Sequence, residues 1–91
     1  MTYRYNVVVQ PLDTNGVASG EPIDFNVSNH DDLSVIVRKI REAAVVPESE
    51  AAEFAIGLKL FSEVLIRNRK APLFEPLWPH FGEFMKRLKG R

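Results

Sequence analysis

The chain has 91 residues, of which 45% are apolar and 26% charged, and its formal net charge is zero. This length fits one domain, and the balance of residue types excludes a disordered chain. The absence of cysteine excludes disulfides and thiolate metal sites. The N-terminus has no apolar signal core and the longest apolar run covers only 43–46, so we predict no membrane span and a cytoplasmic location.

The first part of the chain alternates apolar and polar residues with a period of two, on both sides of a stretch rich in turn residues. This pattern predicts a β-hairpin over residues 2–28. A two-residue turn at Asn15-Gly16 would send the two apolar sets to opposite faces. Pairing Val7 with Phe25 avoids that, so we expect a loop with an odd number of residues, or a bulge. The predicted buried face holds Tyr5, Val7, Val9, Ile23, Phe25 and Val27.

Apolar side chains then recur every three or four residues, which predicts helices. The first helix should cover about 30–44, with Asn29 as its N-cap. The second and longest should cover about 49–69, with Ser49 as its cap and cations in its last turn.

The long helix is apolar on two sides. One stripe consists of Ala51, Phe54, Ala55, Leu58, Phe61 and Leu65. The opposite stripe, Ile56, Leu60 and Val64, is either core or an interface. Gly57 costs about 1 kcal/mol in a helix relative to alanine, which close approach of another element would offset. We therefore predict that Ile56, Gly57, Leu60 and Val64 take part in self-association.

Three prolines interrupt the remaining chain. We expect a short helical turn at about 72–76 and a last helix at about 79–89, with Pro79 at its first position. Its predicted buried face holds Leu77, Phe81, Phe84, Met85 and Leu88. The predicted fold is α+β: an antiparallel β-hairpin followed by three or four helices that share one core, in a single domain over residues 1–91.

Several segments resemble a family of short bacterial proteins that is catalogued as a domain of unknown function. The segments are Asn29-His30-Asp31-Asp32-Leu33, Gly57-Leu58-Lys59-Leu60-Phe61, Asn68-Arg69-Lys70-x-Pro72-Leu73-Phe74 and Phe81-Gly82-Glu83-Phe84-Met85-Lys86. The resemblance covers nearly the whole chain. It implies a small bacterial protein and supplies no catalytic or binding residue.

His30, Asp31 and Asp32 carry groups that bind metals. Neighbouring helical positions point about 100° apart, so these three do not converge on one ion. We interpret them as a cap and first-turn charges, and we predict no metal site and no cofactor.

His80 follows the prolines, and a chain folded back there would bring it near Arg69 and Lys70. A histidine among cations fits an anion-binding or acid–base site. No nucleophile stands at a recognisable catalytic spacing beside it. We therefore predict no catalytic residue, favour a surface position for His80, and keep anion or partner binding by these three residues as a hypothesis.

Charge is uneven along the chain: residues 1–58 sum to −5 and residues 59–91 to +5. Basic clusters at 67–70 and 86–91 flank aromatic residues, a pattern that serves single-stranded nucleic acid. Both clusters also end predicted helices, where the helix dipole favours cations. With a pI of about 6.7, the chain lacks the basic balance of a dedicated nucleic-acid binder.

The leading hypothesis is a small intracellular interaction or regulatory module that binds protein, including itself as a homodimer, because every strong pattern has a packing explanation. The second is nucleic-acid binding through the basic C-terminal half. The third is a small-anion binder or enzyme at Arg69, Lys70 and His80. We lean against an enzyme and predict no membrane partner.

Overall fold

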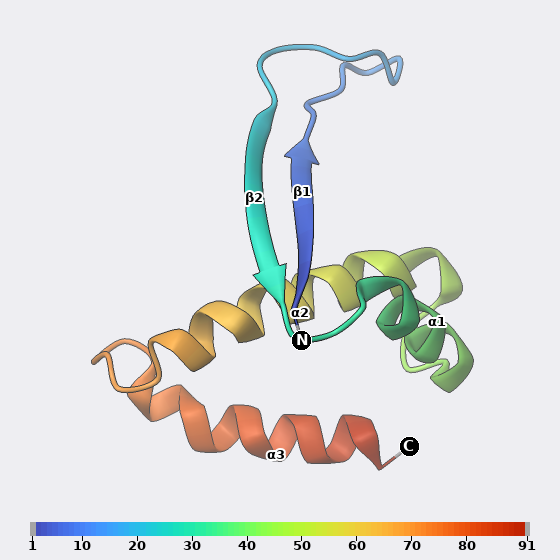
Figure 1. The fold of residues 1–91 in the computed structure, drawn as a ribbon. Coiled ribbons are helices and arrows are strands. Elements are labelled where there is room, and N and C mark those ends of the chain that lie inside the picture. The colour runs from blue at the N-terminus through green and yellow to red at the C-terminus, as the bar shows by residue number, and fades with distance from the viewer. Residues whose placement is uncertain (1, 91) are drawn as a thin grey trace. The chain divides into compact units, whose positions relative to one another are not determined.

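The computed structural model describes residues 2–90 (Figure 1). It confirms an α+β fold, in which an antiparallel two-stranded hairpin precedes three α-helices. The elements, in chain order, are β1 Tyr3–Val9, β2 Ile23–Asn29, α1 Leu33–Ala43, the 3-10 helix η1 Glu48–Glu50, α2 Ala51–Arg67, the 3-10 helix η2 Glu75–Leu77 and α3 Trp78–Lys89.

The chain divides into two compact units. The hairpin unit is Met1–Asp31, and the helical unit is Asp32–Arg91. Each unit is described by itself below. The single domain over residues 1–91 stays a prediction.

The predicted register of the hairpin is confirmed. Val7 lies opposite Phe25, and the same alignment continues to both ends of the two strands without a bulge. The strands are joined by a long loop rather than a two-residue turn. An isolated bridge between Leu12 and Ala18 closes that loop. At its tip, the Asp13 carboxylate accepts hydrogen bonds from the Asn15 and Val17 amides, at 2.8 and 3.0 Å.

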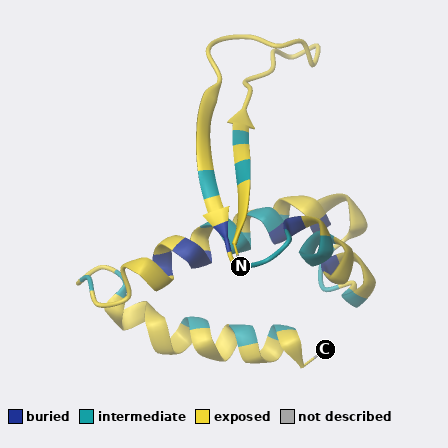
Figure 2. Ribbon diagram, viewed as in Figure 1, coloured by how far each residue is buried: buried dark blue, intermediate teal, exposed yellow. Residues whose placement is uncertain are grey.

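The predicted burial of the hairpin's apolar face is largely wrong. Tyr5, Val7 and Val27 are half-buried. The exposed fractions are 41% for Phe25, 51% for Val9 and 63% for Ile23. Figure 2 shows both strands mostly in the colour of exposed residues. The alternation of apolar and polar residues determines which side chains share a face of the sheet. It does not determine whether another element covers that face, and a two-stranded sheet cannot bury it alone.

The segment between the strands and the helices differs from its prediction. Asn29 is the last residue of β2, is 1% exposed, and accepts a hydrogen bond from the Asp31 amide at 3.0 Å. It therefore does not cap α1. Asp32 caps that helix, because its carboxylate accepts hydrogen bonds from the Ser34 hydroxyl at 2.7 Å and the Ser34 amide at 3.0 Å. These two bonds lower the pKa of the Asp32 carboxyl below its ordinary value.

The end of α1 is unusual in its backbone. Ala44 has a φ of 52° in the left-handed region, and its amide donates to the Ile40 and Arg41 carbonyls. Glycine is the usual residue at such a helix end, because its lack of a Cβ removes the steric cost. The chain then reverses and enters α2 through η1. Ser49 lies within η1 and is not the cap of α2, whose cap position is Glu50.

The core of the helical unit lies between α1 and the start of α2. Ile40 is 6% exposed, while Ala51 and Ala55 are fully buried. Half-buried apolar side chains surround them: Ile36, Val37, Val45, Val46, Phe54 and Leu88. The small alanines allow α1 to approach α2 closely, and the residues at this contact are among the most buried of the described chain.

Candidate functional site

The contact between α2 and α3 is made by phenylalanine rings. The two helices run antiparallel in the helical unit (Figure 1). The ring of Phe61 lies 6.1 Å from that of Phe81 and 6.4 Å from that of Phe74, centroid to centroid. Phe84 lies 6.3 Å from Phe81 and 6.5 Å from Phe54. These distances suit favourable aromatic pairs, so a ladder of five rings joins the two helices.

This aromatic seam is only partly covered. The predicted buried face of the last helix has no fully buried residue: Phe81, Met85 and Leu88 are half-buried. Leu77 and Phe84 are 38% and 45% exposed. On α2, Phe61 is 42% exposed. The prediction of a buried face on α3 is therefore wrong in extent. Bulky rings lie between the two helices, and within residues 32–90 no further element covers them.

Four exposed apolar residues of the helical unit, Phe61, Val64, Leu77 and Phe84, lie along one side of the seam. In α2, Gly57, Leu60 and Val64 recur at spacings of three and four, so they share one helical face. α3 runs antiparallel to α2 and meets it through Phe61 and Phe81. Helical geometry therefore places Phe84 on the same side, together with Leu77, which directly precedes α3 at its N-cap position. We call the following six residues the α2–α3 surface: Gly57, Leu60, Phe61, Val64, Leu77 and Phe84.

The four residues predicted for self-association fall into two groups. Ile56 and Leu60 are half-buried, whereas Gly57 and Val64 are exposed, Val64 by 39%. A Cβ built on Gly57 meets no heavy atom within 4 Å in the part of the chain that the structure describes. Packing within the described chain therefore does not account for a glycine in the middle of α2.

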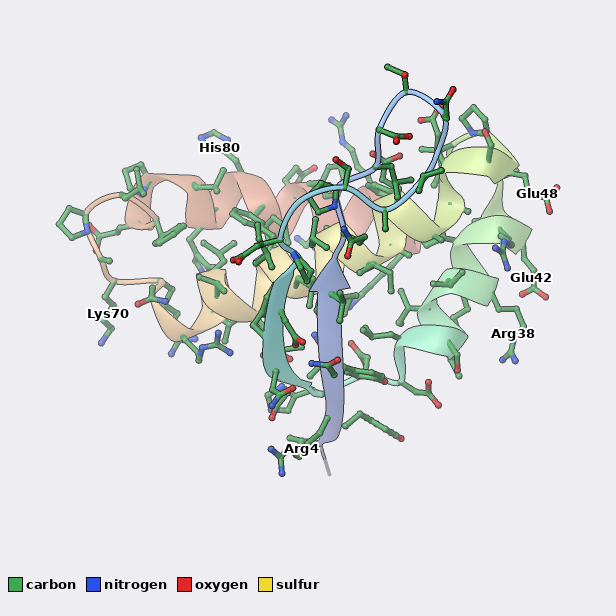
Figure 3. All side chains as sticks on the ribbon, turned by 90° about the horizontal axis from the view of Figure 1, so that it is seen from above. Arg4, Arg38, Glu42, Glu48, Lys70 and His80 are labelled. Carbon is green, nitrogen blue, oxygen red and sulfur yellow. The ribbon has the colours of Figure 1, made fainter. Side chains whose placement is uncertain are left out.

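Two of the three residues predicted to bind an anion lie in the turn that follows α2. Arg69 and Lys70 line an open hollow of about 530 Å³, together with Ile66, Arg67, Asn68 and Ala71. The Arg69 guanidinium carbon lies 5.8 Å from the centre of the Trp78 ring, a cation–π contact. His80 is exposed and is not among the lining residues. In Figure 3, His80 and Lys70 point away from each other.

The second basic cluster lies on the last turn of α3. Lys86, Arg87 and Lys89 are exposed. The Arg87 Nε atom lies 3.8 Å from the Glu83 carboxylate, and both side chains are mostly in solvent. An exposed pair of this kind contributes little to stability. The cluster therefore lies where the helix dipole favours cations, and its interpretation as helix-end charge stays a prediction.

Two features are absent from the described residues, a group of metal-binding side chains and a helix that could cross a membrane. Among residues 2–90, no three or more histidine, aspartate or glutamate side chains are grouped so that they could hold a metal ion. No helix within the described range combines the length and hydrophobicity that crossing a membrane requires.

Sequence reasoning missed two features of the helical unit. It assigned Phe61, Phe84 and Leu77 to the core, because apolar periodicity is the same for a buried face and an open one. It did not anticipate the burial of Ser62 and Glu63, which are 6% and 8% exposed on α2. Neither residue breaks the helical pattern, so the sequence carries no signal for their burial.

A known protein family matches almost the whole chain. The family is described as a domain of unknown function with a solved structure, DUF3861, and its profile covers residues 3–90. The chain belongs to this family. The resemblance inferred from the sequence is confirmed.

A solved structure agrees with this assignment. The chain is similar to a crystal structure of a protein of unknown function from Pectobacterium atrosepticum, with 31% sequence identity and a TM-score of 0.86. The similarity covers 100% of both chains. The search of curated proteins gave no match. Neither the family nor the solved structure assigns a specific function.

Proposed function

We propose that this protein is a small interaction module that binds a second copy of itself through the α2–α3 surface. The observation that carries the proposal is the exposure of Leu77, Phe84 and Phe61 beside Gly57. Contiguous apolar surface of this kind is typical of protein interaction sites. The proposal includes two expectations from the sequence: a cytoplasmic location and one core shared by hairpin and helices.

Gly57 supports a helix as the partner element. With no Cβ and open space above it, Gly57 leaves room for the backbone of another helix to approach. The flanking residues Leu60 and Val64 would then pack beside the crossing point, as ridges fit into grooves. A two-fold dimer brings the same face of α2 from both copies together and is the commonest closed assembly.

Charge supports an antiparallel arrangement of the two copies. The N-terminal end of α2 carries Glu50 and Glu53, and its C-terminal end carries Arg67 and Arg69. An antiparallel crossing of two α2 helices places each acidic end beside the partner's basic end. Such complementarity favours the correct orientation more than it adds affinity.

Two matched substitutions test the proposal. Val64 and Ile66 are both β-branched, are 39% and 45% exposed, and lie on nearly opposite sides of α2. Val64→Glu should abolish the dimer, because it buries a carboxylate at the interface. Ile66→Glu should leave the dimer intact. The measurement is light scattering after size exclusion at about 100 µM protein, with a monomer mass of 10.3 kDa.

The outcomes are distinct. A wild-type mass of one monomer would refute self-association. Equal effects of the two substitutions would refute the α2–α3 surface as its site. Leu60→Glu shows whether Leu60 belongs to the interface or to the core. A folded monomer indicates an interface residue, and an unfolded chain indicates a core residue.

A second candidate function has one specific observation in its favour. Arg67, Arg69 and Lys70 line one hollow beside Trp78. Cations next to an aromatic face suit a phosphate followed by a stacked base. Titration with single-stranded DNA at several salt concentrations tests this candidate, since phosphate contacts weaken steeply with salt. Absence of salt-dependent binding would eliminate it.

A further inference from the structure

The outer edge of β2 is suited to strand pairing. β1 and β2 are seven residues each and pair without a bulge, and within residues 2–90 they form a sheet of two strands. Natural edge strands are usually short, bulged, or guarded by lysine or proline. Ile23–Asn29 contains no lysine, proline or bulge, and residues 23–26 are all exposed. This edge is therefore a template for another strand.

β2 is complementary to itself in one register. We infer that β2 pairs antiparallel with β2 of a second copy, with Phe25 opposite the partner's Phe25. This inference rests on the proposed self-association. The register places Ile23 opposite the partner's Val27, so all apolar residues of the strand meet apolar residues. An odd shift would send the two apolar faces to opposite sides of the sheet.

The polar face of β2 is complementary in the same register. Asp24 lies opposite the partner's Asn26. The Asn6 side-chain amide donates to Asp24 at 2.6 Å and to Asn26 at 3.0 Å within each hairpin. Asn26 therefore uses its side-chain oxygen within the hairpin, and its amide nitrogen is the atom suited to donate to the partner's Asp24. No two like charges face each other in this arrangement.

The edge of β1 is less suited to the same contact. Several antiparallel registers of β1 with itself pair apolar residues, and β1 has no acidic residue that could face Arg4 in any of them. One of these registers places Tyr5 opposite the partner's Val7. On the other face, the same register sets Arg4 opposite the partner's Val8. That pairing leaves the Arg4 charge without an acidic partner, whereas the β2 register matches both faces. A symmetric β2 contact joins two hairpins into a four-stranded antiparallel sheet with one continuous apolar face.

Engineered disulfides test the contact and its register. The chain contains no cysteine, so a protein with one introduced thiol forms disulfides only between copies. Opposite residues of paired strands have Cβ atoms about 4.5–5.5 Å apart, close to the span of a disulfide. An equimolar mixture of Asp24→Cys and Asn26→Cys proteins should therefore form mixed disulfides about tenfold faster than either protein alone.

A matched control lies on the neighbouring strand. Asn6 is exposed on the same face as Asp24 and Asn26. Asn6→Cys should form disulfides as slowly as random collision allows. If Asn6→Cys proteins form disulfides faster than the mixture of Asp24→Cys and Asn26→Cys, the contact lies at β1 and the inference is overturned. If Asn26→Cys alone forms disulfides faster than that mixture, the proposed register is overturned. Equal slow rates for all combinations would overturn the contact.

The unsubstituted protein provides a second measurement. Within residues 23–27, the alternate backbone amides that point away from β1 should exchange about tenfold more slowly in concentrated than in dilute protein, because pairing satisfies the outward N–H groups of the edge. Unchanged exchange would overturn the inference. A wild-type mass that stays at one monomer defeats self-association as a whole. A dimer without protection in β2 defeats only the strand contact and leaves the α2–α3 surface standing.

Discussion

The two contacts of α2 use apolar residues at the same helical spacing and reach different degrees of burial. Against α1, the contact is made by Ala51 and Ala55, which are fully buried, with Ile40 at 6% exposure. Against α3, the contact is made by rings, and Phe61 and Phe84 keep more than 40% of their surface exposed. Small side chains let two helices close together, whereas large ones fill the space between them and leave their flanks open.

This difference separates the structural role of α2 from its proposed binding role. The alanine side of the helix belongs to a dense core, where removal of a methyl group leaves a cavity. The phenylalanine side is an open surface, where the same removal costs less, since part of each ring is already in water. The following predictions test the comparison, from the largest expected effect to the smallest.

The core contact should be the more sensitive of the two. Ile40→Ala should lower the free energy of unfolding by about 2–5 kcal/mol, because the cavity beside Ala51 and Ala55 cannot collapse fully. Urea denaturation followed by circular dichroism measures the loss. A cost below about 1 kcal/mol would show that this contact is no denser than the seam.

The seam should tolerate the loss of a whole ring. Phe61→Ala should cost about 1–2 kcal/mol, less than the cost of truncating a fully buried phenylalanine, since Phe61 contacts two rings but is 42% exposed. The same denaturation experiment measures it at low concentration, where the monomer dominates. A cost as large as that of Ile40→Ala would place the seam in the core.

Gly57 distinguishes monomer stability from association. Gly57→Ala should stabilise the monomer by about 0.5–1 kcal/mol, because alanine is the better helix former and the space above Gly57 is open. The same change should weaken the dimer, since the added methyl group obstructs close approach. Denaturation and light scattering measure the two effects. Stabilisation of both states would show that no helix crosses at this point.

The turn that directs α1 towards α2 has a residue in an unfavourable conformation. Ala44→Gly should stabilise the protein by about 0.5–1 kcal/mol, because glycine adopts the left-handed backbone without a Cβ clash, and part of the gain is lost to the greater freedom of the unfolded chain. Thermal unfolding checks the sign. Ala43→Gly, inside the helix, is the matched control and should destabilise.

The smallest expected effect concerns pH at the start of α1. The pKa of Asp32 is lowered in the folded state, chiefly by the Ser34 hydroxyl. Its stabilising contribution is therefore complete above the carboxyl's unfolded pKa and is lost as the pH falls through the lower folded value. Asp32→Asn should flatten this acid limb of the stability curve. An unchanged pH dependence would show that Asp32 is not the group responsible.

The register of the hairpin was predictable because it depends on parity. Val7 and Phe25 must share a face, and this requirement excludes half of all alignments. Pro79 likewise lies in the first turn of the last helix, at its second position rather than the predicted first, because proline is tolerated there. Both predictions rest on local geometry that no distant contact can change.

Burial was not predictable, because it depends on what lies beyond the element. Phe25 fits the strand pattern, and Phe84 the helical pattern, as regularly as Ile40 fits its own, yet of these three residues only Ile40 is buried. The cap of α1 was misplaced for a related reason. Asn29 and Asp32 are both good N-caps, and the choice was decided by β2, which extends to Asn29. For the candidate site, the sequence identified the α2 stripe but not its partner residues on α3.

The contact between Arg69 and Trp78 gives the protein an intrinsic optical probe. Trp78 is the single tryptophan of the chain, stands at the first position of α3, and is 37% exposed beneath the Arg69 guanidinium. Its fluorescence therefore originates from one known place, where the seam meets the basic end of α2. A shift of the Trp78 emission on dilution would report a change at the α2–α3 contact. Quenching of that emission by an added polyanion would report binding at the hollow, and neither measurement needs an attached label.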